Sequence, residues 1–229
     1  MESPEIIKLK SVNFSYAKKL VLDDLSLSIL KGTVHGILGA NGSGKTTLFK
    51  YIFNHYNQQQ KNKIAFLETE GFFYSYMTGY EYLTLLSPYK ALDLNSWNDL
   101  FQLPLDDYVH TYSTGMKKKL SIMAVLLLKR EIIILDEPYN GLDLKSCEVL
   151  RYIIQRLKHL GNTVIMSSHI LETVFKSADY ISYLQDGHIL KTYSQDEFYL
   201  LSDLIQGQII NEMTPKIDRL LDTPTTNSN

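Results

Sequence analysis

The sequence predicts an α/β protein with a mostly parallel sheet, a short antiparallel β lobe and an inserted helical lobe. Apolar runs at 34–38, 132–135 and 163–167 have the length of buried strands and alternate with helical segments, as in a parallel sheet wrapped by helices. Two earlier segments, 6–16 and 25–29, are also predicted to be strands; apolar and polar residues alternate loosely in the first and more regularly in the second. A hydrophobic fraction of 45% in 229 residues supplies a core for such a body.

The elements after the third strand follow in chain order. We expect a helix over 45–54, a polar connector over 56–62 and a strand at 64–67. The segment of about 72–116 begins with many tyrosines and phenylalanines and then shows short, interrupted helical patterns. This segment is therefore assigned to the inserted helical lobe.

The second half of the chain continues the alternation. Helices are expected over 117–128 and 143–160, and a Gln-Asp-Gly hairpin turn at 185–187 joins the last two strands. We assign residues 1–221 to one unit and expect the Thr-, Asn- and Ser-rich tail at 222–229 to be disordered.

Charge and composition exclude several classes of protein. With 23 Lys plus Arg against 25 Asp plus Glu, the chain lacks the basic excess of proteins that bind nucleic acid by bulk electrostatics, and no nucleic acid is expected as a partner. The longest apolar run, 122–128, is too short to span a membrane. Residues 1–5 lack the apolar core of a signal peptide, and the single cysteine, Cys147, excludes an internal disulfide.

Residues 39–46 read Gly-Ala-Asn-Gly-Ser-Gly-Lys-Thr and match the pattern G-x-x-x-x-G-K-[ST] between a predicted strand and a predicted helix. Glycines let the backbone N–H groups curl around phosphate oxygens, and the helix N-terminus adds the positive end of a dipole. We expect Lys45 to reach the β- and γ-phosphates and the Thr46 hydroxyl to bind Mg²⁺. The candidate nucleotide-binding residues are Gly39, Asn41, Gly42, Ser43, Gly44, Lys45, Thr46 and Thr47. The loop predicts a P-loop NTPase core.

Two acids follow the buried strand at 132–135. A parallel strand delivers the residues after its C-terminal end to the ligand crevice, so Asp136 is placed to hold Mg²⁺ and Glu137 to act as general base on the attacking water. The phosphate loop and this acid pair fit kinases, GTPases and many ATPases equally well.

The segment 112–120, Tyr-Ser-Thr-Gly-Met-Lys-Lys-Lys-Leu, distinguishes among these families. It resembles the signature motif, usually written L-S-G-G-Q, of the ATP-binding subunits of ABC (ATP-binding cassette) transporters, and Ser113 lies 23 residues before Asp136. Ser113 and Gly115 match the motif, whereas the residues at its first, third and fifth positions differ. In the family, the signature binds the γ-phosphate of ATP held by the facing subunit. The resemblance covers about residues 6–200.

Further positions are similar to other motifs of the family. His169, 32 residues after Glu137, resembles the switch histidine that contacts the γ-phosphate, and Tyr16 matches the aromatic that stacks on adenine. Asp143 resembles the aspartate of the D-loop, which couples the two ATP sites; it also suits the N-cap of the helix that it opens. Thr69 stands where the family has a metal-sensing glutamine, and its neighbours Glu68 and Glu70 are alternatives for that role.

The resemblance implies a subunit that hydrolyses ATP with Mg²⁺, using Glu137, His169 and Lys45 as catalytic residues. It implies two partners, a second copy or a homologous ATPase subunit and an integral membrane permease, and a peripheral location on the cytoplasmic face of the cell membrane. The signature and the Ser-Ser-His-Ile-Leu-Glu stretch are most similar to exporter-type members.

Three alternatives explain less of the sequence. A soluble ABC ATPase that acts on ribosomes or DNA usually carries two cassettes or a long coiled coil. A P-loop kinase or GTPase leaves Ser113, Gly115 and His169 unexplained, and a non-hydrolysing subunit is disfavoured by the intact Lys45 and Glu137. Six aromatic residues between 72 and 82 are either lobe core or the docking groove for a coupling helix of the permease.

Overall fold

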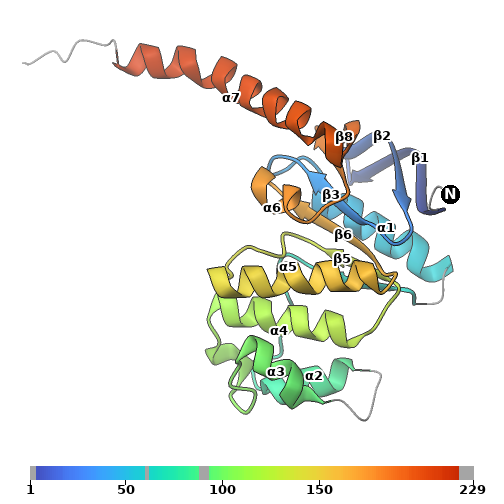
Figure 1. The fold of residues 1–229 in the computed structure, drawn as a ribbon, viewed down its shortest axis with the longest axis vertical. Helices are drawn as coiled ribbons and strands as arrows, with labels where there is room; N and C mark the ends of the chain where they lie inside the picture. The colour runs from blue at the N-terminus through green and yellow to red at the C-terminus, as the bar shows by residue number, and fades with distance from the viewer. Residues whose placement is uncertain (1–3, 60–61, 88–92, 222–229) are drawn as a thin grey trace, which may run out of the picture.

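The computed structural model describes residues 4–59, 62–87 and 93–221 (Figure 1). Within these residues six strands form one sheet in the order β4-β5-β6-β3-β7-β8, parallel except for β8, and the antiparallel pair β1-β2 forms a separate lobe. The strands are β1 (Glu5–Tyr16), β2 (Lys19–Leu30), β3 (Val34–Leu38), β4 (Ile64–Leu67), β5 (Ile132–Leu135), β6 (Thr163–Ser168), β7 (Tyr180–Gln185) and β8 (His188–Ser194). The predicted fold class is confirmed.

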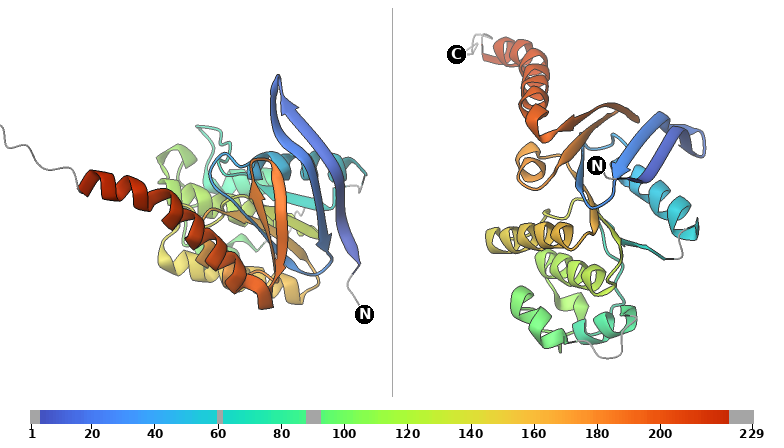
Figure 2. Two further views of the ribbon diagram at one scale, coloured as in Figure 1. Left: turned by 90° about the horizontal axis from the view of Figure 1, so that it is seen from above. Right: turned by 45° about the vertical axis from the view of Figure 1, so that its right-hand side comes forward.

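Helices cover both faces of the main sheet (Figures 1 and 2). They are α1 (Lys45–Gln59), α2 (Gly79–Leu86), α3 (Leu94–Phe101), η1 (Val109–Thr111), α4 (Thr114–Leu127), α5 (Leu144–His159), α6 (Leu171–Phe175), η2 (Gln195–Glu197) and α7 (Phe198–Leu221). The short α2 and α3 lie beyond α4 and form the inserted lobe, at the end of the molecule opposite α7 (Figure 1).

The main sheet separates two apolar cores because successive strand residues point to opposite faces. Ile132 and Ile134 of β5 join a core with α1 and the β1-β2 lobe, whereas Ile133 and Leu135 join the core under α4 and α5. β5 is apolar at every position because it is buried on both faces. The burial fixes the position of the strand, and with it the point at the strand's C-terminal end where Asp136 and Glu137 follow.

Helix α1 is longer than the sequence predicted. The expected end at 54 and the connector over 56–62 are wrong for 55–59, which are helical; residues 60–61 lie outside the described part of the chain. Tyr56 packs against the core of the β1-β2 lobe, accepts a hydrogen bond from the Lys8 backbone N–H at 2.7 Å and donates one to the Lys8 carbonyl at 2.5 Å. This tertiary contact favours continued helix where the local sequence is only polar.

Helix α7 was not predicted, because the sequence analysis assigned no helix after the last strand. Among its 24 residues, all of them described, Phe198 and Leu201 alone are buried, and Pro215 lies inside it. Its apolar residues have helical spacing, which the sequence analysis missed, although Pro215, a residue that usually ends or kinks a helix, lies among them. The tail at 222–229 lies outside the described residues.

The aromatic residues between 72 and 82 divide into two groups. Phe73 and Tyr82 pack against the core of the lobe. The others are exposed, by fractions of 74%, 55%, 85% and 52% for Phe72, Tyr74, Tyr76 and Tyr80. The core interpretation is therefore confirmed for Phe73 and Tyr82, and docking of a coupling helix stays a prediction for the exposed residues.

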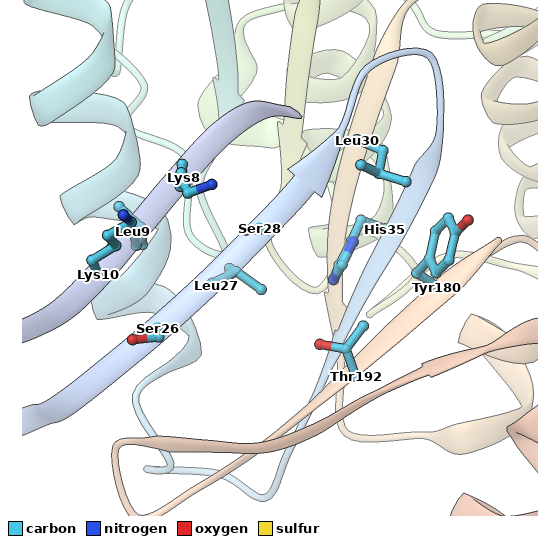
Figure 3. A pocket seen from close by; sticks show the side chains of 10 residues that line it. All are labelled: Lys8, Leu9, Lys10, Ser26, Leu27, Ser28, Leu30, His35, Tyr180 and Thr192. Atoms are coloured by element: carbon cyan, nitrogen blue, oxygen red, sulfur yellow. The ribbon is translucent and has the colours of Figure 1, made fainter. Parts of the chain in front are cut away.

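A cleft of about 460 Å³ lies between the β1-β2 lobe and the edge formed by β7 and β8, with His35 of β3 at its side (Figure 3). His35 is 1% exposed, and its Nε2 lies 2.8 Å from Ser182 Oγ, which is 2.6 Å from Thr192 Oγ1. Burial lowers the pKa of His35 to about 4, against a smaller opposing effect of Asp179. The ring is therefore neutral near pH 7.

We predict that the free energy of unfolding falls as the pH drops from 6.5 toward 4. The unfolded chain protonates His35 near pH 6.5, whereas the folded chain resists protonation down to about 4, so protons favour unfolding in this window by about 3 kcal/mol. Urea denaturation at several pH values checks this, with the non-titrating His35→Gln variant as reference. The variant should show the smaller pH dependence; equal slopes would contradict the assignment.

Candidate functional site

The glycine-rich loop at 39–44 connects β3 to α1 and is fixed by its neighbours. Gly42 and Gly44 have positive φ angles of 83° and 109°, which residues with a side chain rarely adopt. A Cβ on Gly39 would collide with the carbonyl oxygen of Leu184. The β7-β8 turn also holds the loop, since the Gly187 N–H donates to the Ser43 carbonyl at 3.1 Å. The glycines are thus required by conformation and by close approach.

Lys45, the first residue of α1, lies under this loop. Its side chain is 6% exposed, and its Nζ donates to the carbonyls of Gly39 at 2.7 Å and Ala40 at 3.1 Å. The same ammonium lies 3.3 Å from Glu137 Oε1. A buried cation is thus held between the loop and the acid that follows β5.

Asp136 is fully buried and accepts three side-chain hydrogen bonds within the described chain. Thr46 and Thr69 hydroxyls donate to Oδ2 at 2.6 Å each, and the Ser167 hydroxyl donates to Oδ1 at 2.5 Å. The donors come from α1, from the loop after β4 and from β6. Hydrogen bonding of this kind is what permits a carboxylate to be buried.

Glu137 occupies a left-handed backbone conformation, with a φ of 46°. Such a conformation costs an L-residue roughly 1–2 kcal/mol. The Glu137 N–H is held at 2.8 Å by Ser167 Oγ, and Oε2 lies 3.0 Å from His169 Nδ1. The sharp turn sends the two consecutive acids to different partners, so one carboxylate faces hydroxyls and the other faces a lysine and a histidine.

A cavity of about 270 Å³ opens over the loop. Its lining residues are Val21, Asn41, Gly42, Gly44, Lys45, Thr46, Thr47, Thr69, Glu137 and Asn140. Next to it, Ser43 Oγ is buried and has no hydrogen-bond partner in the described chain. Backbone N–H groups, an ammonium and a spare hydroxyl around one cavity suit a polyphosphate, while Thr46 and Asp136 offer the oxygen ligands that Mg²⁺ prefers.

The structure brings one of the three candidates at 68–70 to the acids. Thr69 contacts Asp136, whereas Glu68 is half exposed and pairs with Lys50 at 3.6 Å, and Glu70 is exposed. The Thr69 carbonyl also accepts a hydrogen bond from Lys118 Nζ at 3.0 Å. Thr69 is therefore the residue of this loop that can respond to whatever binds at Asp136.

The signature residues lie on a separate surface. Ser113 is the exposed N-cap of α4, with its Oγ accepting from the Met116 N–H at 3.3 Å, and it does not line the cavity over the loop. A Cβ on Gly115 would lie 2.7 Å from the Gly141 carbonyl, so this glycine is needed for packing against the loop before α5. Tyr112 is buried in the helical lobe and donates a hydrogen bond to the Pro104 carbonyl at 2.5 Å.

Asp143 caps α5, as its position suggested. Its Oδ1 accepts from the Ser146 N–H at 2.8 Å, and Oδ2 pairs with Lys119 of α4 at 2.8 Å. Lys119, and then Ser146, lower the pKa of Asp143 well below its ordinary value. The residue therefore ties the start of α5 to the signature helix.

Tyr16 lies at the exposed end of β1. Its ring is 51% exposed and packs edge-on against Phe14, with centroids 5.1 Å apart. The β1-β2 lobe contacts the phosphate loop through β2, since Leu22 and Val21 lie closest to a Cβ added on Gly44. Tyr16 thus has a free ring face on an element that is anchored to the loop.

Comparison with known proteins agrees with this geometry. The family model described as ABC transporter matches residues 22–140. The lantibiotic transport ATP-binding protein SrtF of Streptococcus pyogenes is 30% identical over an alignment of 226 residues that covers 90% of this chain and 99% of that protein. This chain belongs to the ABC transporter ATP-binding family.

Two further relatives extend the comparison. The bacitracin transport ATP-binding protein BcrA of Enterococcus faecalis is 30% identical over an alignment of 223 residues that covers 85% of this chain and 71% of that protein. CbiO1 of Clostridium perfringens, part of the ABC transporter complex cbiONQ, has the same fold, with a TM-score of 0.68 at 23% identity over 95% of this chain and 99% of that one.

The sequence-based family and activity are therefore confirmed. The chain is an ATP-binding subunit of an ABC transporter, an ATPase whose hydrolysis is coupled to transport. No helix in the described ranges is both long and apolar enough to cross a membrane.

Two residues of this ABC site escaped the sequence analysis. Ser167 bridges both acids, and Lys118, whose pKa is lowered by burial against the opposing effect of Asp136 and Glu137, bonds to Thr69. The parallel register, in which Leu135 pairs with Met166, places the next residue of each strand side by side and could have indicated Ser167. No local pattern marks Lys118.

We predict that Ser167→Ala lowers the free energy of unfolding by roughly 1–3 kcal/mol and reduces ATPase activity. The substitution leaves a buried carboxylate oxygen and the Glu137 N–H each without a partner. Denaturant unfolding and steady-state hydrolysis measure the two effects. Ser168→Ala, one position on, serves as control, because among the described residues this hydroxyl bonds to residues 170 and 173 and not to the acids. Equal losses in the two variants would contradict the bridging role.

Proposed function

We propose that this chain is a Mg²⁺-dependent ATPase that works in pairs on the cytoplasmic face of an integral membrane permease and drives export. The observation that carries the proposal is the chain of contacts from the phosphate loop through Lys45 to Glu137 and His169, beside the buried Asp136. The exporter-like signature supports the direction, as do two relatives named for lantibiotic and bacitracin transport.

Each residue has a separable task in this proposal. The loop N–H groups, Lys45 and Thr47 bind the phosphates, and Thr46 with Asp136 holds Mg²⁺, with Thr69 adjacent. The metal supplies charge neutralisation at the phosphate oxygens. Glu137 accepts a proton from the attacking water, and His169 positions its carboxylate and faces the γ-phosphate. Tyr16 stacks on the adenine.

A second subunit, either a copy or a homologous chain, completes the site. Ser113 is exposed at a helix N-terminus, on a surface apart from the cavity over its own phosphate loop. A serine hydroxyl and helix N–H groups bind anions well, so this surface suits the ATP phosphates of a facing subunit. Asp143, exposed and tied to the signature helix, then couples the two sites.

The soluble ABC ATPase is the alternative, and it requires a nucleic acid or ribosomal surface as partner. The net charge of −2 and the exposed aromatic group on the helical lobe favour a protein partner instead.

We predict that Glu137→Gln lowers the hydrolysis rate by at least about 100-fold, because the general base is lost while the shape is kept. The variant should still bind MgATP and should accumulate as a dimer. Phosphate release and sedimentation velocity measure the two properties. A variant that hydrolyses ATP at the parent rate would contradict the assignment of Glu137.

Ser113→Arg tests the pairing in the same background. It should bind ATP as tightly as the parent at its own loop yet remain monomeric, because the bulky cation blocks the surface that faces the partner. Loss of ATP binding by the monomer, or an undisturbed dimer, would contradict the cross-subunit role.

The exposed aromatic group is the proposed docking surface for the permease. We predict that the double variant Phe72→Ser, Tyr76→Ser keeps the basal ATPase activity of the isolated subunit but lowers export from preloaded cells that carry the permease by about tenfold or more. Tyr152→Ser, which removes a 68% exposed aromatic from α5, is the matched control. Equal export by the two variants would contradict the location of the docking surface.

A further inference from the structure

Helix α7 leaves the body at the end of β8 and projects beyond it (Figures 1 and 2). Its first turn is anchored by Phe198 and Leu201, and Tyr183 donates a hydrogen bond to Gln208 Oε1 at 3.0 Å. From Gln208 to Leu221 every residue is exposed. More than half of the helix therefore has no residue buried against the rest of the described chain.

The projecting part carries one apolar face, which we name the α7 stripe. Its members are Ile209, Ile210, Met213, Ile217, Leu220 and Leu221, exposed by 38% to 78%. At 100° per residue they fall within a sector about 120° wide, the width of a helix face that packs against a core. Glu212 and Lys216 pair at 2.8 Å outside the stripe.

Physical chemistry requires a partner for this stripe. A helical segment of about a dozen residues is marginally stable in water by itself, and Pro215 removes one backbone hydrogen bond from this one. Single exposed apolar residues are ordinary on a protein surface, but six on one face of a projecting helix mark an interaction site.

The charges on α7 disfavour a lipid surface as the partner. Interfacial helices carry a polar face rich in Lys and Arg. Here three acids, Asp203, Glu212 and Asp218, stand against two bases, Lys216 and Arg219, which gives a net charge of −1. The proposed permease surface lies on the lobe at the opposite end of the molecule (Figure 1). The partner is therefore a protein that approaches from another side.

One cavity joins α7 to the nucleotide site. Its volume is about 910 Å³, and it is lined by the phosphate loop from Gly39 to Ser43, by His169 and, on α7, by residues that include Ile205 and Ile209. Ile209 belongs both to this cavity and to the stripe. A molecule that closes over the phosphate loop thus meets the start of the stripe directly.

We propose that the α7 stripe packs against the second copy of this chain when two copies close over ATP. The inference rests on the pairing proposed above and adds to it an interface outside the ATP sandwich. Two-fold symmetry supplies the contact twice per dimer, so its contribution to the free energy of dimerisation is doubled.

The test compares dimer affinities in the Glu137→Gln background with MgATP, by sedimentation velocity over a dilution series. The triple variant Met213→Gln, Ile217→Gln, Leu220→Gln changes exposed residues away from the cavity lining. It should raise the Kd of the dimer by about 100-fold or more, while ATP binding to the monomer stays unchanged. The triple variant Lys216→Gln, Asp218→Asn, Arg219→Gln alters the same stretch outside the stripe and should dimerise like the parent.

A dimer of undiminished affinity in the stripe variant would overturn this inference and leave the pairing intact. A Glu137→Gln parent that stays monomeric would overturn the pairing itself, and this inference with it. Hydrogen exchange in the Glu137→Gln variant with an unaltered α7 stripe is a second test of the contact. The amides of 208–221 should gain protection with MgATP, and unchanged exchange would speak against the contact. Stripe-dependent binding to anionic phospholipid vesicles without ATP would instead assign the stripe to a lipid surface and overturn the proposal.

Discussion

The buried carboxylate of Asp136 is the constraint on which the site depends. A carboxyl group with no solvent exposure is tolerated only where hydrogen bonds replace water, and here three hydroxyls do so from three different elements. Thr46 belongs to the helix that opens after the phosphate loop, Thr69 to the loop after β4 and Ser167 to β6. The energetic need of one side chain thus fixes the relative positions of the segments that form the nucleotide site.

The conformation of Glu137 follows from this arrangement. Asp136 must point among the hydroxyls, so the next residue can reach Lys45 and His169 only if the backbone turns sharply, and it does so with a positive φ. Ser167 accepts from the Glu137 N–H and donates to Asp136, which offsets the local strain with two hydrogen bonds. Adjacent acids thereby acquire different surroundings, as the proposed metal ligand and the proposed proton acceptor require.

The sequence predicted those parts of the structure whose cause is local. The glycines of the phosphate loop and the four apolar residues before Asp136 impose their conformations wherever they stand, so the loop, the strand and the acids were placed correctly. The end of α1 depends on the contact of Tyr56 with Lys8, which lies 48 residues away. The apolar residues of α7 have helical spacing that the sequence analysis missed, and Pro215 among them is a residue that usually ends or kinks a helix. Ser167 and Lys118 act through partners on other elements and are invisible in a linear motif.

One of the three departures from the family signature has an explanation within the chain. The tyrosine at 112 in place of leucine fills the lobe core and bonds to Pro104, and a Cβ on Gly79 would collide with its hydroxyl, so lobe and signature are packed as one piece. Helix α4 then contacts the site at three points: Gly115 against Gly141, Lys119 with Asp143, and Lys118 with the Thr69 carbonyl. A rigid helix with these contacts transmits displacement better than a flexible loop, because packed elements shift as units. The lobe that carries the exposed aromatic group is therefore mechanically connected, through α4, to the loop whose threonine bonds to Asp136.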